Sequence, residues 1–341
     1  MSGSCPSGMN PRRRAWSQPT YPAGMPDRRQ VAVSAVVTAV AAAVLSGCGG
    51  HEASHPVGSG SQRGTLSSSV GSPTTTGTAR PRSVELLAER LRRLDRRIDS
   101  RRTTPSELRR AGERQQLLLR TLGLHPGEER RVLARLPPMQ RRRTAATLRA
   151  GHLLRSMFPV KPGALSRVLP AWRIERPAPA PELWADYHQA QRRYGVGWSY
   201  LAAINMVESS FGRVHGLSTA GARGPMQFIP ATWRAYGAGG DIQDPHDAVL
   251  GAARLLSANG FARTPLAALR HYNDSSAYAR AVTLLADVMR RDPRQFFGFY
   301  HWRVFYLTAR GNVLLPVGYD ERRGVPVRSW LARHPDALVL P

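Results

Sequence analysis

The feature that most constrains the fold is a helical spacing of apolar residues, which recurs through the middle of the chain. Between residues 83 and 98 the apolar positions are Val84, Leu87, Leu91, Leu94 and Ile98. Steps of three and four place side chains on one face of an α-helix, whereas strands alternate with a period of two. Residues 197–211 repeat the helical pattern, and Thr104-Pro105-Ser106-Glu107 is typical of a helix start. The sequence therefore predicts a mainly α fold.

The 341 residues divide by composition into six stretches. We expect a leader with a signal peptide at 1–47, a Gly-, Ser-, Thr- and Pro-rich flexible tether at 48–82, an Arg-rich helical segment at 83–158, a Pro-rich linker or extended strap at 159–181, a helical domain at 182–295 and an aromatic-rich C-terminal extension at 296–341.

The C-terminal extension contains a sequence pattern that is typical of β-strands. Residues 304–308 and 312–315, joined across Arg310-Gly311, predict a small β-hairpin. Its aromatic rings, and those of Trp172, Trp184 and Trp198, fit two interpretations, stacking on a ligand or packing in a core. We favour core packing, which is the commoner fate of such rings.

The N-terminal apolar run predicts export. Residues 31–47 are apolar and follow Arg28 and Arg29, as in a signal peptide. The run ends in Leu45-Ser46-Gly47-Cys48, which resembles the lipobox at which bacterial prolipoproteins are lipidated on the cysteine and cut before it. The alternative is an ordinary signal or an uncleaved anchor with a chance cysteine. We expect Cys48 to be the lipidated residue and the folded part to lie outside the cytoplasmic membrane, held by its acyl chains.

The segment before Arg28 is longer than the charged start of a signal peptide usually is. Translation therefore starts either at Met1, with an extended leader, or at Met25. Cys5 has no role if Met25 is the start. Because Cys5 and Cys48 are the two cysteines and both precede the predicted domains, we expect no disulfide and no thiolate metal site in the folded part.

The formal net charge is +26, which favours polyanionic partners. Residues 81–150 hold 19 arginines against 8 acidic residues, an excess of 11 positive charges, whereas residues 182–294 hold 12 against 9. The Arg-rich segment either contacts phosphate-bearing polymers or lipid headgroups, or is the solvated face of a helical hairpin, which we favour. A nucleic-acid partner is not expected, because the chain has an export signal and no recognised reading motif.

One carboxylate lies where a core residue is expected. The stripe of the helix predicted at 197–211 is Leu201, Ile204, Glu208 and Phe211. A buried, unpaired carboxylate has a raised pKa. A carboxylic acid that is protonated near neutral pH is what glycosidic bond cleavage requires. The alternative places Glu208 at the edge of the stripe, exposed or paired with Arg213 or Arg223, and periodicity alone favours that alternative.

Three short sequence blocks favour the interpretation of Glu208 as a buried acid. They are VESSFG at 207–212, GPMQFIP at 224–230 and HYN at 271–273. In this order and spacing they resemble the signature blocks of the lytic transglycosylase (SLT-type) domain, which belongs to the lysozyme-like superfamily with the goose-type lysozymes. The sequence around these blocks is most similar to that of the membrane-bound murein transglycosylase-like lipoproteins of actinobacteria. The resemblance covers about residues 182–292.

The resemblance implies a role for six residues. It makes Glu208 the single catalytic acid and base, Ser209 a serine that contacts substrate or orients the acid, Met226 and Gln227 the lining of a cleft, and Tyr272 and Asn273 the pair beside the catalytic carboxyl. A hydroxyl at Tyr272 could donate to Glu208 and tune its pKa. Pro225 and His271 differ from the residues usual at these positions of the family's sequence pattern. Pro225 also removes one backbone N–H donor.

The resemblance also implies the reaction. Glu208 cleaves the β-1,4 bond between MurNAc and GlcNAc in peptidoglycan and leaves a 1,6-anhydroMurNAc end, without a metal or organic cofactor. Asp241, Asp244 and Asp247 are better explained by helix capping than as a second catalytic carboxylate. A hydrolytic muramidase and a non-catalytic wall-binding lipoprotein are the alternatives. The expected partners are glycan strands, the membrane and anionic wall polymers, and the expected state is a monomer facing the cell wall.

Overall fold

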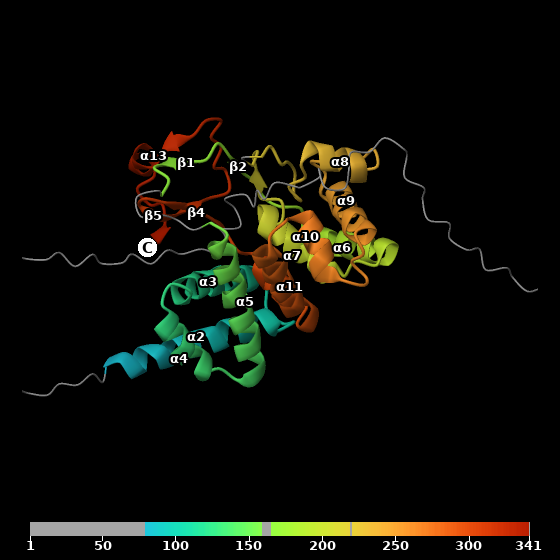
Figure 1. Ribbon diagram of the computed structural model, residues 1–341. Coiled ribbons are helices and arrows are strands. Elements are labelled where there is room, and N and C mark those ends of the chain that lie inside the picture. Colours follow the sequence, from blue (N-terminus) through green and yellow to red (C-terminus); the bar gives the residue numbers. More distant parts are fainter. Residues whose placement is uncertain (1–78, 159–164, 219, 341) are drawn as a thin grey trace, which may run out of the picture. The chain divides into compact units, whose positions relative to one another are not determined.

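The computed structural model describes residues 79–158, 165–218 and 220–340, with side chains from residue 83 (Figure 1). The predicted signal peptide, Cys48 and the tether up to residue 78 lie outside the described residues. Within the described part, no helix combines the length and apolar character that crossing a membrane requires.

The described part is mainly helical, as the sequence predicts. Its helices are α2 (Ala79–Asp99), α3 (Pro105–Leu122), α4 (Pro126–Ala134), α5 (Pro138–Ser156), α6 (Ala180–Tyr194), α7 (Trp198–Ser209), α8 (Pro230–Tyr236), α9 (Pro245–Ala258), α10 (Pro265–Tyr272), α11 (Ser276–Arg291), α12 (Arg294–Tyr300) and α13 (Val327–Arg333). Its strands are β1 (Val168–Leu169), β2 (Arg173–Ile174), β3 (Val214–His215), β4 (Val304–Thr308), β5 (Gly311–Leu315), β6 (Val325–Pro326) and β7 (Val339–Leu340).

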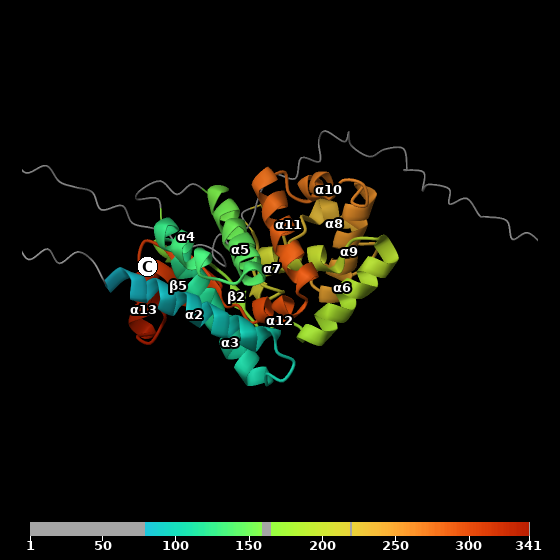
Figure 2. The same cartoon turned by 90° about the horizontal axis from the view of Figure 1, so that it is seen from below.

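The Arg-rich segment forms helices α2 to α5. Helix α3 begins as predicted, because the Thr104 hydroxyl accepts from the Glu107 backbone N–H while the Glu107 carboxylate accepts from the Thr104 backbone N–H. This reciprocal capping box satisfies two donors that the first turn of a helix leaves free. Helix α2 packs against α3, and α5 packs along α11, where both views show them side by side (Figures 1 and 2).

This segment shares one core with the rest of the described chain. Leu91 and Leu154 belong to the same buried cluster as Leu285 of α11 and Val313 of β5. A buried polar contact reinforces the junction, because Gln115 donates both to Asp95 at 2.9 Å and to Gln295 at 3.3 Å. The predicted segment boundaries at residues 158 and 295 are therefore changes of composition within a region that shares one hydrophobic core.

The Pro-rich stretch is an extended strap over residues 165–179, and its last two residues begin α6. Leu169 and Val325 face each other in the antiparallel pair of β1 and β6. Ile174 and Val214 do so in the pair of β2 and β3. Leu169 and Ile174 are buried, so the strap is attached by its apolar side chains as well as by its backbone.

The C-terminal hairpin forms as predicted. Strands β4 and β5 pair antiparallel from Val304 opposite Leu315 to Thr308 opposite Gly311, and β7 adds a third strand against β5. The aromatic rings of this region pack inward: Phe296, Phe299, Trp302 and Phe305 are buried. Trp172 and Trp198 are buried as well, and Trp184 is half-buried against the same core.

Helix α7 is buried on every side, because α6, α9, α11 and α12 all pack against it. This differs from the one-sided stripe that the sequence predicts. The helix also ends earlier than the predicted range of 197–211: its last residue is Ser209, and Ser210 is the C-cap. Ser210, Phe211 and Gly212 follow one another with φ values of 53°, 65° and 83°. Left-handed backbone at two consecutive residues with side chains is unusual and directs the chain sharply away from α7.

Candidate active site

Glu208 lies in the last turn of α7 with 4 % of its surface exposed. The two arginines considered as partners are engaged elsewhere or exposed. Arg213 donates to the carbonyl oxygens of Ser210 at 2.9 Å and Tyr300 at 2.6 Å. Arg223 is exposed, and its backbone pairs with that of Phe228. Both versions of the alternative, an exposed or an ion-paired Glu208, are therefore wrong.

Burial raises the pKa of Glu208 to about 8, while a hydrogen bond from Tyr278 acts in the opposite direction. Removing a carboxylate from water disfavours its charged form, which is the dominant effect here. At pH 7 the protonated form then exceeds the ionised form by about ten to one. Among the described residues, no second carboxyl group and no cation contributes to this pKa.

The hydroxyl of Tyr278 donates to Oε1 of Glu208 at 2.7 Å. Tyr278 lies in the first turn of α11, where Ser275 caps the helix by accepting from the Tyr278 backbone N–H. Since Tyr278 occupies Oε1, the proton of the neutral acid belongs on Oε2. Tyr278 is the residue that the sequence analysis missed.

The expectation for Tyr272 is corrected by this geometry. Its hydroxyl donates to the carbonyl oxygen of Met226 instead of to Glu208. The rings of Tyr272 and Tyr278 are stacked with centroids 6.4 Å apart and planes 4° apart. Tyr272 therefore supports the ring that contacts the acid and holds the 224–230 loop.

Ser209 is fully buried and binds the neighbouring loop. Its hydroxyl donates to the Pro225 carbonyl oxygen and accepts from the Gly212 N–H at 2.8 Å. The Asn205 amide donates to the same carbonyl at 2.8 Å and accepts from the Tyr187 hydroxyl at 2.6 Å. These contacts fix the loop to the end of α7 and do not involve the Glu208 carboxyl, so both roles considered for Ser209 stay predictions. Although Pro225 lacks an N–H, its carbonyl is the point at which this loop is fixed to α7.

The loop itself is a tight turn around Gly224 and Gln227. Gly224 has a φ of +74°, and a Cβ there would lie 1.9 Å from the Ile242 carbonyl oxygen, so this position requires glycine. Gln227 has a φ of 50° and donates from Nε2 to the Gly224 carbonyl at 2.9 Å. The Met226 side chain is fully buried, so Met226 supports the loop from within.

Two buried polar atoms close to these elements have no hydrogen-bond partner among the described residues. They are Oδ1 of Asn273 and Oγ of Ser210. Asn273 is 5 % exposed and directly follows Tyr272, whereas His271 is exposed. A buried acceptor without a donor is costly, and a bound ligand can supply the missing donor. Among the predicted site residues in the described part, Asn273 is the one whose side chain has a buried acceptor without a donor.

Of the three aspartates of the 241–247 loop, Asp244 has the capping role that the sequence predicts, and the other two accept from backbone N–H groups of the loop. Asp244 caps α9 by accepting from the Asp247 N–H at 2.9 Å. Asp247 accepts from the Asp241 N–H at 2.9 Å, and Asp241 accepts from the Gln243 N–H at 2.8 Å. Their carboxylates are thus occupied by local backbone donors.

Residues 187–280 match the family model of the transglycosylase SLT domain. The match runs from Tyr187 in α6 to the first turn of α11, and it includes Glu208, the 224–230 loop, Tyr272 and Tyr278. The resemblance noted from the three blocks is confirmed, and this part of the chain is an SLT-type transglycosylase domain of the lysozyme-like superfamily. Neither the curated proteins nor the solved structures yielded a match to the chain. The closeness to actinobacterial membrane-bound lipoproteins stays a prediction.

Proposed function

We propose that this protein is a peptidoglycan lytic transglycosylase in which Glu208 serves first as the acid and then as the base. The observation that carries the proposal is the buried carboxyl of Glu208, whose pKa of about 8 keeps it protonated at neutral pH while Tyr278 donates to it. The match to the SLT domain supplies the reaction class.

In the first step Glu208 gives its proton to the oxygen that joins C1 of MurNAc to GlcNAc, and the C1–O bond breaks. Positive charge develops at C1, and the N-acetyl oxygen of MurNAc assists by approaching it. Glu208 is now a carboxylate in a buried site, and the Tyr278 hydroxyl stabilises it, because a hydrogen bond to a charged acceptor is stronger than one to a neutral acceptor. Burial thus favours the acid and Tyr278 favours the base.

In the second step the carboxylate takes the proton from the C6 hydroxyl of MurNAc, and the C6 oxygen bonds to C1. The product has a 1,6-anhydro end, no water is consumed, and Glu208 returns to its protonated form. One carboxyl is sufficient for both transfers, which agrees with the local backbone hydrogen bonds of Asp241, Asp244 and Asp247.

Asn273 is proposed to bind the substrate. Its buried Oδ1 has no donor among the described residues and would accept from a sugar hydroxyl or N-acetyl N–H. We expect Asn273→Ala to raise KM for glycan strands by about tenfold, which corresponds to the loss of one good hydrogen bond of about 1.4 kcal/mol, with little change in melting temperature. An unchanged KM would remove Asn273 from the site.

The location is part of the proposal. The apolar run at 31–47 and Cys48 support an exported protein that is lipid-anchored at the cell membrane and faces the wall. Labelling growing cells with radioactive palmitate tests this directly. We expect label on the wild-type chain and none on Cys48→Ala, and label on both would disprove lipidation at Cys48.

The reaction is tested by digesting purified peptidoglycan and weighing the released fragments by mass spectrometry. We expect fragments with 1,6-anhydroMurNAc ends, each lighter by one water than the hydrolysed equivalent. Fragments with reducing MurNAc ends would instead identify a muramidase with the same acid. Absence of soluble fragments would favour a wall-binding protein without activity.

A further inference from the structure

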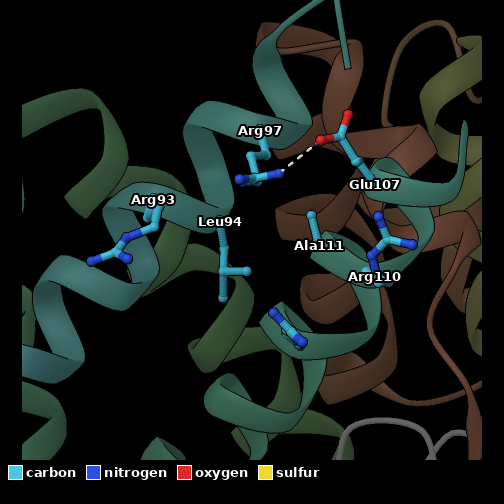
Figure 3. A pocket seen from close by; sticks show the side chains of 7 residues that line it. Arg93, Leu94, Arg97, Glu107, Arg110 and Ala111 are labelled. Carbon is cyan, nitrogen blue, oxygen red and sulfur yellow. Dashed lines mark hydrogen bonds and ion pairs between the residues drawn. The ribbon is translucent and has the colours of Figure 1, made fainter. Parts of the chain in front are cut away.

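A cavity of about 340 Å³ lies between α2 and α3, in the Arg-rich segment (Figure 3). Glu208 is not among the residues that line it. Four arginines line it, Arg93 and Arg97 from α2 and Arg110 and Arg114 from α3, together with Glu107 and the apolar Leu94 and Ala111. The volume falls at the lower end of the range of about 300–1,000 Å³ that small-molecule sites occupy. The cavity is therefore large enough for a small polar group.

The charges around this cavity are not balanced. Arg97 pairs with Glu107 at 3.1 Å, and Glu107 is itself fixed by the capping box of α3. The side chains of Arg93, Arg110 and Arg114 have no ion pair or hydrogen bond within the described part of the chain. Figure 3 shows a single interaction among the lining residues, between Arg97 and Glu107. Three positive charges remain for one cavity.

Some of the other arginines of the same segment are paired. Arg92 and Arg96 both reach Glu89, and Arg143 binds Asp95 and Asp99. Others, such as Arg141, Arg142 and Arg149 of α5, are exposed and have no side-chain partner among the described residues. What distinguishes Arg93, Arg110 and Arg114 is that all three line one cavity.

Like charges four residues apart on a helix repel each other. Arg93 and Arg97 have this spacing on α2, and Arg110 and Arg114 have it on α3. An anion in the cavity would relieve the repulsion of both pairs at once. Guanidinium groups bind phosphate oxygens through two parallel N–H donors, which favours phosphate over a simple halide.

Four residues of helix advance about 6 Å along the axis. Helix α3 therefore offers two unpaired arginines in a row, Arg110 and Arg114, and α2 adds Arg93, rather than one point of charge. This arrangement suits successive phosphates of a linear chain better than a single phosphate ion. A membrane surface is a poorer fit, because the arginines surround a hollow and Glu107 lies among them. The apolar Leu94 and Ala111 suit the carbon segments between phosphates.

We propose that the cavity between α2 and α3 is a binding site for a phosphodiester-linked polyol polymer, with Arg93, Arg110 and Arg114 as the phosphate-binding residues. Glu107 holds Arg97 in place and leaves the other three arginines to the ligand. Such a site would retain the enzyme beside anionic polymers while its SLT domain reaches glycan strands.

The test measures binding of the full-length chain to fluorescently labelled poly(glycerol phosphate) by anisotropy. The cavity variant carries Arg93→Gln, Arg110→Gln and Arg114→Gln. The matched control carries Arg141→Gln, Arg142→Gln and Arg149→Gln, which remove three exposed charges from α5 in the same segment. Each substitution shortens a solvent-exposed side chain, and melting curves check that both variants fold.

We expect the cavity variant to bind the polymer about tenfold or more weakly, because phosphate contacts to guanidinium groups are lost. The control is expected to change affinity by less than about threefold, because Arg141, Arg142 and Arg149 do not line the cavity and contribute only to the net charge. Equal losses in the two variants would show that net charge alone attracts the polymer and would overturn the site. The same holds if neither variant loses affinity.

A second arm uses vesicles that contain phosphatidylglycerol, whose headgroup carries the same phosphodiester. Cavity-dependent binding to the vesicles without binding to the soluble polymer would overturn the choice of a polymer. No glycan strand is present in either arm, so these results are independent of the proposed cleavage by Glu208.

Discussion

Replacing Glu208 by glutamine should stabilise the protein increasingly as the pH rises. Glutamine keeps an oxygen that accepts from Tyr278 but carries no titrating proton. In the wild type the pKa of Glu208 rises from an ordinary 4.5 to about 8 on folding. The unfolded chain therefore loses this proton above pH 4.5, whereas the folded chain keeps it until about pH 8. The free energy of unfolding that Glu208 contributes to the wild type at low pH is therefore lost as the pH rises. The loss is about 3 kcal/mol between pH 5 and pH 8.

The assay is urea denaturation of both proteins at several pH values between 5 and 8. We expect the unfolding free energy of Glu208→Gln minus that of the wild type to increase by about 3 kcal/mol over this range. Subtracting the two proteins cancels the titration of all other groups. Glu182→Gln, at an exposed position of α6, is the control and should give a flat difference. A flat difference for Glu208→Gln would refute the reasoning, because Glu208 would then be ionised at neutral pH in the folded protein.

Two further substitutions test the positioning of the acid and the loop beside it. Tyr278→Phe removes a hydrogen bond that lowers the pKa of Glu208, so the alkaline limb of the activity profile should move to higher pH, with activity about tenfold lower. Tyr272→Phe, which loses a bond to a carbonyl instead, should leave that limb in place, and equal shifts in both variants would contradict the assignment. Gly224→Ala should cost about 3 kcal/mol or more in thermal or urea unfolding, because its Cβ would overlap a backbone carbonyl at a positive φ. Gly221→Ala, with φ of +75° and open space around its Cβ, should cost only about 1–2 kcal/mol, and similar costs at the two glycines would argue against the close approach.

Local patterns in the sequence account for much of the fold. The apolar period identifies the helices, the capping box identifies the start of α3, and Arg310-Gly311 identifies the hairpin of β4 and β5. These features depend on neighbours within a few residues. The burial of α7 on all sides could not be predicted in this way, because it depends on α6, α9, α11 and α12, which pack around it from distant parts of the chain.

The site shows the same division. Glu208 stands out in its own helix, but periodicity could not decide between a buried and an exposed carboxyl. Its partner Tyr278 is 70 residues away and escaped notice. A signal for it exists: Ser275 is a suitable N-cap, and a stripe on the following helix places Tyr278 on the buried face. That stripe is Tyr278, Val282, Leu285 and Met289. No local pattern predicts the hydrogen bond of Tyr272, which lies three residues before Ser275. Its hydroxyl donates to the Met226 carbonyl instead of to Glu208.

The most direct test of the central claim is the rate at which soluble fragments are released from purified peptidoglycan by the wild type, Glu208→Gln and Glu182→Gln. If Glu208 is the acid and then the base, Glu208→Gln should be slower by between about 100- and 10,000-fold, the usual contribution of a general acid and base. Glu182→Gln should match the wild type. Release by Glu208→Gln within a few-fold of the wild-type rate would contradict the claim, whatever the products are.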